Sequence, residues 1–409
     1  MTSLATDIRL SIRNLTRNVN RSLVACLTVA GGVIAFLLAG GFINWVFHDM
    51  REATIHSQLG HIQIVRPGYF EKGIADPYAF LLPASSPELK LLEENPDITS
   101  VTPRLAFSGL VSREETTVPF IGEGIDPAKE APISTRISII DGRNLGDLKN
   151  PEVILGEGLA KSLGAIPGDS IVLLATSAKG SASAVELRVV GTFATIYKDY
   201  DDTALRVPIT FARKLMRVNG STSWVALLKD TQYTVRVEEA LASKMSKADY
   251  QIVPWTKLAD FYNKTVALFS KQVDVMKFII GLIIILTISN TQTMSVMERT
   301  TEIGTSLAIG LRNSEVMRLF LVEGILIGIA GGFFGVVLGF GLAEAISAIG
   351  IPMPPPPGMA RGYTGQILVS VSLAADAFLL AMVTTLVASV MPAWRASQMN
   401  IVDALRCNQ

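Results

Sequence analysis

The sequence predicts a membrane protein with four transmembrane α-helices and a large α+β domain between the first and second of them. Three observations support this fold class. The chain of 409 residues is 49% hydrophobic and only 18% charged, whereas soluble domains carry about 25% charged residues. Four apolar runs are each long enough, alone or with a short helical extension, to cross a hydrocarbon core of roughly 30 Å. Between the first two runs lies a long polar stretch in which strand-like and helix-like patterns alternate.

The apolar runs place the transmembrane helices at residues 22–47, 273–293, 319–349 and 367–391. Paired glycines in the first run predict that it packs closely on other helices, because small residues let helices approach in lipid. Three carboxylates fall inside the later runs, namely Glu323, Glu344 and Asp376. We expect them to lie near span ends, with Glu323 in the first turn of the third helix, and to snorkel or bind a neighbouring helix rather than relay protons.

Arginines in the short flanking segments predict the orientation of the spans, since such residues favour the cytoplasmic side. They precede the first span, separate the second from the third and follow the fourth: Arg9, Arg13, Arg17, Arg21, Arg299, Arg312, Arg318, Arg395 and Arg406. The connection between the third and fourth spans has only Arg361. We therefore expect both termini and the link 294–318 to be cytoplasmic, with 48–272 on the far side.

Residues 1–21 are expected to form a cytoplasmic amphipathic helix. Ile8, Ile12, Leu15 and Val19 recur with the period of an α-helix and form one apolar stripe. The arginines beside the stripe suit a helix lying on an anionic lipid surface. A topology signal explains the same arginines, and the two interpretations are compatible.

The extracytoplasmic domain, residues 48–272, is predicted to be α+β and to contain two subdomains. The middle of this stretch (about 105–228) resembles an insertion and is expected to be built on a βαβ-type frame. Ser86 is expected to cap a helix, and Gly164 to end another. The final stretch, 260–272, is expected to be helical and continuous with the second span. The predicted strands are 60–65, 101–110, 118–121, 152–155, 171–175, 185–193 and 224–228, and the predicted helices are 86–95, 157–163, 208–216 and 235–245.

The connection 350–366 contains four consecutive prolines, which favour an extended polyproline II rod. A stiff cap between two helix ends is the plainer interpretation, and a docking strip that uses Arg361 and Tyr363 is the alternative. Residues 392–409 form the cytoplasmic tail.

Motifs for catalysis or nucleotide binding are absent from the sequence. There is no P-loop, zincin, nucleophile-elbow or paired C-x-x-C motif, so we expect a non-catalytic chain. A metal site at His48, His56 and His61 is conceivable, but their spacing suits no zinc pattern, and a chance grouping is the better interpretation. The net charge of zero gives no reason to expect a nucleic-acid partner.

The polar stretch Met294–Gly324, wedged between the second and third spans, carries the strongest motif. Its sequence, ERTTEIGTSLAIGLRNSEVMRLFLVEG from Glu298 onward, resembles the FtsX-like/MacB-type ABC transporter permease family. The matching positions are Glu298, Arg299, Glu302, Ile303, Gly304, Ala308, Gly310 and Glu323. The tail is similar as well: Pro392-Ala393-x-Arg395-Ala396 precedes IVDALR, although Ile401 stands where the family often has proline.

The far-side domain resembles the same family more loosely. GEGLAKSLGAIPGDSIVL at 156–173 and LRVVGTF at 187–193 are similar to the MacB-type periplasmic core. GHIQIVRPGY at 60–69 is similar to the lipoprotein-releasing LolC/LolE-like branch. The order of one span, an outer domain and three further spans agrees along nearly the whole chain.

The resemblance implies a mechanism and a set of partners. The chain would be the permease subunit of an ABC transporter in a bacterial inner membrane, paired with a second copy or a homologous permease. A separate dimeric ABC ATPase would bind ATP and Mg²⁺, so that no cofactor is expected in this chain. The ATPase would contact the link 294–318 as a coupling helix, with Ile303, Leu307 and Leu311 on one apolar stripe. The implied coupling residues are Glu298, Arg299, Glu302, Ile303, Gly304, Leu307, Ala308, Gly310 and Leu311.

Three functions remain open at this point. Mechanotransmission could serve the release or export of a lipoprotein or lipid, which the 60–69 region favours. The chain could instead be a MacB-like efflux component that works with a periplasmic adaptor. It could also be an FtsX-like regulatory transducer that activates a periplasmic partner without moving cargo.

Overall fold

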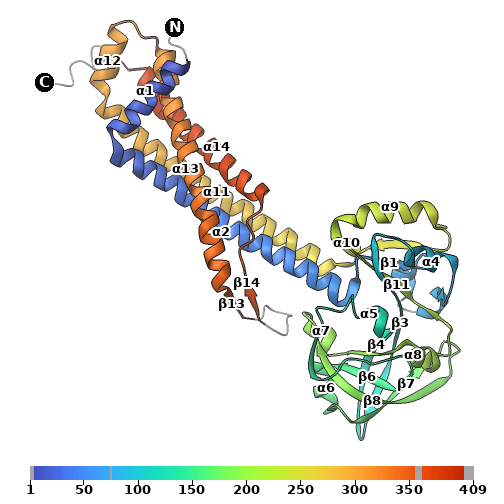
Figure 1. Ribbon diagram of the computed structural model, residues 1–409. Coiled ribbons are helices and arrows are strands. Elements are labelled where there is room, and N and C mark those ends of the chain that lie inside the picture. Colours follow the sequence, from blue (N-terminus) through green and yellow to red (C-terminus); the bar gives the residue numbers. More distant parts are fainter. Residues whose placement is uncertain (1–3, 74–75, 355–361, 400–409) are drawn as a thin grey trace. The chain divides into compact units, whose positions relative to one another are not determined.

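The computed structural model describes residues 4–73, 76–354 and 362–399 of the chain (Figure 1). Two compact units emerge. The helical unit comprises Met1–His48, Thr265–Pro352 and Thr364–Gln409, and the α+β unit comprises Asp49–Lys264 and Met353–Tyr363.

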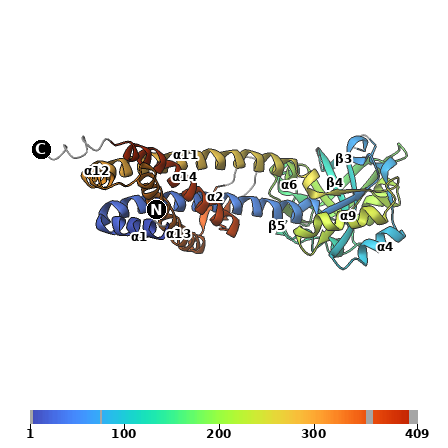
Figure 2. The same ribbon diagram turned by 90° about the horizontal axis from the view of Figure 1, so that it is seen from above.

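Within the described residues, four helices are long and apolar enough to cross a membrane, as predicted. They are α2 (Val19–Thr54), α11 (Asp260–Glu298), α13 (Asn313–Ile349) and α14 (Val371–Ser397). A π-helical turn, η1 (Ile55–Leu59), extends α2 at its C-terminal end. The expected continuity of residues 260–272 with the second span is confirmed, because α11 is one unbroken helix. Two shorter helices, α1 (Leu4–Arg17) and α12 (Thr300–Ala308), lie at the same end of the helical unit (Figures 1 and 2).

Glycines on two faces of α13 let it pack tightly on both neighbours. A Cβ atom at Gly328 would lie 2.3 Å from Oγ1 of Thr385 on α14, and one at Gly335 would lie 2.6 Å from Cβ of Val33 on α2. Each position belongs to a series with a four-residue spacing. The series facing α14 is Gly324, Gly328 and Gly332, and the series facing α2 is Gly331, Gly335 and Gly339. Close approach of this kind drives helix association in lipid, where burial of apolar surface gives little.

The first span also packs through glycine, as predicted. A Cβ atom at Gly32 would lie 2.9 Å from Cδ1 of Ile284 on α11, and one at Gly41 would lie 2.7 Å from Cγ2 of Ile367. At Gly31, in contrast, a Cβ atom would meet nothing within 4 Å.

In the α+β unit, six strands close into a small barrel. The pairings run β3–β4–β9–β6–β8–β7 and return to β3. A large residue is paired with a small one on adjacent strands, as suits a narrow barrel: the Phe107 ring of β3 covers Gly122, its register partner on β4, where a Cβ atom would lie 2.6 Å away. The strands are β3 (Ile98–Arg113), β4 (Thr116–Ile125), β6 (Glu152–Gly156), β7 (Ser170–Thr176), β8 (Ala182–Ala194) and β9 (Ala204–Pro208).

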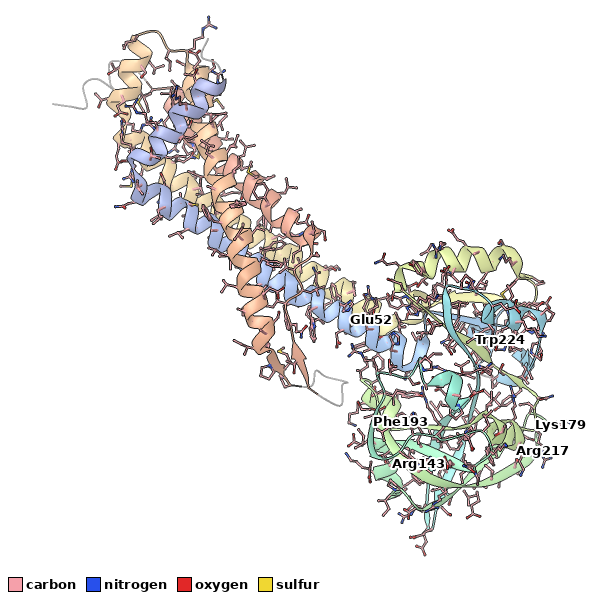
Figure 3. All side chains as sticks on the ribbon, in the orientation of Figure 1. Glu52, Arg143, Lys179, Phe193, Arg217 and Trp224 are labelled. Carbon is pink, nitrogen blue, oxygen red and sulfur yellow. The ribbon has the colours of Figure 1, made fainter. Side chains whose placement is uncertain are left out.

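A second layer shares strand β3 with the barrel. The first half of β3 pairs with β11 (Ser223–Leu228), which pairs with β1 (Ile62–Val65) and then β12 (Gln251–Pro254). Helices α4 (Pro87–Glu93) and α9 (Thr234–Lys244) cover a core that includes Trp224 (Figure 3). The two layers have separate apolar cores, and one long strand, β3, belongs to both of them.

Shorter elements complete the α+β unit. Strand β5 (Ser138–Gly142) lies at the edge beside β8, and β2 (Leu82–Pro83) pairs with β10 (Gly220–Ser221). Helices α6 (Glu157–Leu163) and α8 (Ile209–Met216) pack on the barrel core. The remaining turns of helix are α3 (Tyr69–Lys72), η2 (Pro77–Phe80), α5 (Pro127–Glu130), α7 (Lys198–Asp201), η3 (Thr231–Tyr233) and α10 (Trp255–Leu258).

Local predictions in this unit agree with the structure. Oγ of Ser86 accepts a hydrogen bond from the Leu89 backbone N–H and caps α4. Gly164 ends α6 at φ 63°, a left-handed conformation that favours glycine. Strands β6 and β8 are parallel, with α6 and β7 between them in the chain, which is the βαβ-type frame that the sequence predicts.

The connection between α13 and α14 contains two short paired strands, β13 (Ile351–Met353) and β14 (Tyr363–Gly365). Residues 355–361, which include three of the four prolines and Arg361, lie outside the described residues. The cap and docking interpretations of this connection therefore stay predictions. The tail motif Ile401–Arg406 also lies outside them.

Candidate functional site

The predicted coupling segment folds into the two-turn helix α12, bounded by two breaks. Arg299 leaves the helical conformation between α11 and α12, with φ −101° and ψ 15°. Gly310 follows the end of α12 at φ 105°, a conformation that other residues rarely adopt. The carboxylate of Glu315 then accepts from the Arg312 backbone N–H at 3.0 Å, at the start of α13. These breaks make α12 a discrete element between two long helices.

One face of α12 is buried in an apolar cluster at the end of the helical unit. Ile303, Gly304 and Leu307 are the buried residues of the helix. Ile303 and Leu307 pack with residues from three other helices: Val296, Val316, Phe320, Ala393 and Ala396. Ala393 and Ala396 belong to the tail motif of the sequence, so the two strongest motifs pack against one another.

The predicted stripe is wrong for Leu311. The helix ends at Ala308, and Leu311 lies in the following link with 37% of its surface exposed. Its backbone N–H donates to the Ser306 carbonyl, which closes the turn around Gly310. The left-handed glycine interrupts the helical periodicity on which the prediction depended.

A buried ion pair joins the start of α12 to α13. Nη1 of Arg299 donates to Oε1 of Glu323 at 3.0 Å, and the guanidinium lies over the ring of Phe320. The same carboxylate oxygen accepts from Nδ2 of Asn14 on α1 at 2.7 Å. Of the two outcomes expected for Glu323, binding to a neighbouring helix is confirmed, whereas the placement in the first turn of its helix is wrong. Helix α13 begins at Asn313, so Glu323 lies about three turns inside it, and only 5% of its surface is exposed.

The arginines near the N-terminus bind the coupling segment. Nη2 of Arg17 donates to Oε1 of Glu302 at 2.7 Å, and the guanidinium of Arg21 forms a two-pronged ion pair with Glu298. About half of the Arg17 and Glu302 side chains is exposed, and an exposed pair contributes only about 0.2–1 kcal/mol. These contacts therefore orient α12 more than they stabilise the fold.

Helix α1 presents its polar side to the helical unit. Nε of Arg318 on α13 lies 2.5 Å from Oδ2 of the buried Asp7, and Oγ of Ser11 donates to the Leu319 carbonyl. Ile8 and Ile12 of the predicted apolar stripe are exposed, and so is Val19, which belongs to α2 rather than to α1. Leu15 instead packs against the apolar core of the helical unit, so the chain itself leaves only part of the predicted stripe uncovered.

The charge of Glu302 is maintained by its neighbours. Partial burial acts to raise the pKa of this carboxyl, but the hydrogen bond and the charge of Arg17, together with the charge of Arg299, outweigh that effect and hold the pKa below its ordinary value. Glu302 therefore stays ionised and bound to Arg17 at neutral pH.

The outward side of this region exposes apolar and small residues. Met297, before the helix, is 72% exposed, and Ile309, after it, is 82% exposed. Thr305, Ala308 and Gly310 are exposed as well. A rigid helix with a buried inner face and an uncovered apolar tip is suited to binding another protein.

The three histidines do not gather into a metal site in the described part of the chain, where no group of three His, Cys, Asp or Glu residues could hold an ion. Nδ1 of His61 accepts from the Leu228 backbone N–H, and Nε2 lies 3.0 Å from Oγ1 of Thr231. Burial, and then the charge of His56, lowers the pKa of His61 to about 4. His61 is therefore a neutral part of the α+β core.

The structure brings most of the predicted residues together and adds others that the sequence did not indicate. The additions are Asp7, Ser11, Asn14, Arg17 and Arg21 as partners of the segment and Ala393 and Ala396 as its packing surface. Asp7, Ser11 and Asn14 recur with helical spacing, each one position before a residue of the apolar stripe, and so form a polar face beside it. That polar periodicity was the signal that could have identified them.

Comparisons with known proteins agree with this architecture. Residues 22–244 match the MacB-like periplasmic core domain, and residues 275–401 match the FtsX-like permease C-terminal region. The lipoprotein-releasing system transmembrane protein LolC of Xylella fastidiosa is 27% identical, over 76% of this chain and 78% of LolC. The uncharacterized ABC transporter permease YvrN of Bacillus subtilis is 23% identical, over 98% of each chain.

A third relative is longer than the region it shares. The macrolide export ATP-binding/permease protein MacB of Rhodospirillum rubrum is 26% identical over 98% of this chain, which spans 60% of the length of that relative. The four apolar helices, the α+β unit between the first two, and the matches to both domains lead to one assignment. The chain belongs to the MacB/FtsX/LolC-type family of ABC transporter permeases.

Proposed function

We propose that this permease couples ATP hydrolysis by a separate, dimeric ABC ATPase to movement of its α+β unit, by mechanotransmission. The observation that carries the proposal is the construction of α12. Its inner face, with Ile303 and Leu307, is buried in the helical unit, whereas the tip at Ile309 is 82% exposed. The ATPase would bind that tip, and the buried face would carry the displacement into the spans.

A continuous helix provides a path for the displacement. Helix α11 ends one residue before α12 and is unbroken for 39 residues. Its first residues, up to Lys264, belong to the α+β unit. A force on α12 would thus pass directly into the second span and along it to the far-side domain. In this mechanism the chain performs no catalysis, and the substrate need not pass between the spans.

The arrangement in the membrane follows from the same proposal. The ATPase side, with α12 and both termini, would be cytoplasmic, and the α+β unit would be periplasmic, in a bacterial inner membrane. A second permease, identical or homologous, would complete the transporter. The excess of arginine in the segments around α1 and α12 supports this orientation.

We propose a lipoprotein or lipid of the inner membrane as the cargo. The similarity to LolC, whose name describes lipoprotein release, covers comparable shares of both chains. The alternative is an efflux component that works with a periplasmic adaptor, which the alignment of 98% of this chain with MacB favours. Purification of the transporter, followed by identification of what it retains, distinguishes the two cargo hypotheses. A lipoprotein or lipid transporter would retain its cargo, whereas an efflux component would retain neither lipid nor lipoprotein and would bind an adaptor.

The coupling proposal is tested with an exposed apolar residue at the tip. Ile309→Asp should leave the chain inserted but abolish co-purification with the ATPase and its stimulation, because it places a charge on an apolar contact. Ile166→Asp is the matched control, since Ile166 is an exposed isoleucine of the α+β unit, and it should leave both measurements unchanged. Normal ATPase binding and stimulation by Ile309→Asp would falsify the proposed contact.

A further inference from the structure

The end of the first long helix lies within the α+β unit, and the carbonyl groups of its last turn are all hydrogen-bonded. A helix leaves its last four carbonyl groups without partners in the helix. Here every carbonyl of the π-helical turn Ile55–Leu59 accepts a hydrogen bond. The donors are the Gly60 backbone N–H to Ile55, the Arg136 backbone N–H to His56, Nη2 of Arg206 to Ser57, Nη1 of Arg104 to Gln58 and Nε2 of Gln63 to Leu59.

The two arginines that bind the helix end come from the wall of the barrel. Arg104 lies on β3 and Arg206 on β9, and both side chains are almost completely buried. A guanidinium is permanently charged, and positive charge at a helix C-terminus is favourable because the exposed carbonyls carry partial negative charge. The barrel therefore binds this helix end through charge as well as through hydrogen bonds.

Two carboxylates hold the arginines in position. Glu130 of α5 accepts from Nε and Nη2 of Arg104 at 3.1 and 2.6 Å, a two-pronged geometry with strong directional preference. Glu123 of β4 lies 3.0 Å from Nη2 of Arg206. Ser134 joins the pairs, because its Oγ accepts from Nη1 of Arg206 and donates to Glu130. The cluster thus contains two positive and two negative charges, and five chain segments contribute to it.

The charges of the cluster are maintained at neutral pH. Burial acts to raise the pKa of Glu123, but Arg206 and Arg104 outweigh it and hold the pKa below its ordinary value. A buried cluster of ion pairs adds little stability compared with apolar packing, but it restricts the geometry of the groups it joins. Fixed geometry is what a joint between a helix end and a barrel needs, whereas an apolar core would provide stability without this directional restriction.

The start of α11 is held differently. Trp255 and Tyr262, on either side of the α10–α11 break, pack with Ile55 and Leu227 in an apolar cluster. Ala259, between the two helices, has φ −86° and ψ 58°, outside the helical region. Apolar contacts are non-directional, so this attachment tolerates rotation that the charged attachment of η1 does not.

We propose that Arg104 and Arg206, positioned by Glu130 and Glu123, form a rigid joint that makes the end of the first long helix move as one body with the barrel. These four residues are positioning residues for the transmission of force. The consequence for transport rests on the proposed function, but the rigidity of the joint does not.

The joint is tested in the full chain, reconstituted with its ATPase in lipid nanodiscs. Nitroxide labels are placed at Leu27→Cys, on an exposed site of α2, and at Lys179→Cys, in the exposed β7–β8 turn of the barrel (Figure 3). Cys26→Ala and Cys407→Ser remove the native thiols. Pulsed electron paramagnetic resonance then gives the distribution of the distance between the labels, with or without nucleotide.

Arg206→Met should broaden the distance distribution in the absence of nucleotide, because the helix end loses its charged partner. Arg143→Met is the matched control: Arg143 pairs with Glu152 of the barrel at 2.5 Å and makes no contact with η1, so the distribution should stay narrow. Equal widths for the two variants would overturn the joint. ATPase stimulation should be normal in Arg206→Met, since α12 is untouched.

A second variant covers the case in which Arg206→Met unfolds, which limited proteolysis within residues 49–264 would reveal. Arg206→Lys keeps the positive charge beside Glu123 but loses the planar fork that also reaches Ser57 and Ser134. It should broaden the distribution as well, and a width equal to that of the unmutated chain would overturn the joint. Absence of ATPase stimulation by the unmutated chain would instead contradict the proposed function, which keeps the two failures distinct.

Discussion

Arg299 donates a hydrogen bond to Glu323 across 3.0 Å, and this pair links the break before α12 to the interior of α13. Asn14 of α1 binds the same carboxylate. Three helices therefore meet at one buried charge pair, at the start of the helix that we propose for ATPase binding.

Loss of one partner of this pair should destabilise the helical unit. Arg299→Met leaves the Glu323 carboxylate buried without its positive partner, a change that costs about 3–5 kcal/mol in comparable sites. The expected result is a lower thermal unfolding midpoint in detergent. Arg395→Met, at an exposed arginine of α14, is the control and should change the midpoint little. The double variant Arg299→Met/Glu323→Gln should recover part of the loss, and no recovery would argue against a specific pair.

The left-handed glycine after α12 should not tolerate a side chain. At φ 105°, Gly310→Ala is strained by at least about 1 kcal/mol and should shift the α12–α13 link, weakening ATPase stimulation. Gly341→Ala provides the comparison, because Gly341 lies in α13 with no atom within 4 Å of its Cβ position, and alanine favours a helix by about 1 kcal/mol over glycine. Equal stimulation by both variants would show that the geometry of the link is unimportant for coupling.

The packing of α13 on α2 should be sensitive to a single methyl group. A Cβ atom at Gly335 would lie 2.6 Å from Cβ of Val33 and 3.0 Å from the Ala30 carbonyl, so Gly335→Ala forces the helices apart. Overpacking of this kind costs about 1–3 kcal/mol, measured as a lower midpoint of thermal unfolding. Gly31→Ala, at the open face of α2, should have no such effect. If both substitutions are harmless, the close approach of the two helices is not required.

The α+β unit should lose stability as the pH falls from about 6.5 to about 4. The pKa of His61 is about 4 in the folded protein against an ordinary value of 6.5, so the unfolded chain binds the proton more tightly across this range. The contribution of neutral His61 to the free energy of unfolding is therefore fully present above pH 6.5. The free energy of unfolding falls by up to about 3 kcal/mol as the pH approaches 4.

Urea unfolding of the full chain, followed by tryptophan fluorescence, measures this pH dependence. His61→Asn keeps an acceptor for the Leu228 N–H but does not titrate, so its stability should depend less on pH. His48→Asn should retain the full dependence. Parallel pH profiles for His61→Asn and the unmutated chain would contradict the assignment.

Local and periodic features of the sequence predicted much of the molecule. Apolar runs located the four spans, because length and the absence of charge alone decide whether a helix can cross a bilayer. Strand and helix patterns located the elements of the α+β unit, and Ser86 and Gly164 marked helix ends, since capping is decided within a few residues. The family motif predicted the coupling segment, with an error at Leu311 where Gly310 breaks the helical period.

The tertiary structure alone decided what lies next to what. Arg17 and Glu302 are 285 residues apart in the chain, and nothing in their local sequence indicates that they pair. The barrel closes because β7 pairs with both β3 and β8, and the charged joint at η1 joins five segments. Period and composition describe one element at a time, whereas these contacts depend on the complementary shape and charge of elements that meet only when the chain has folded.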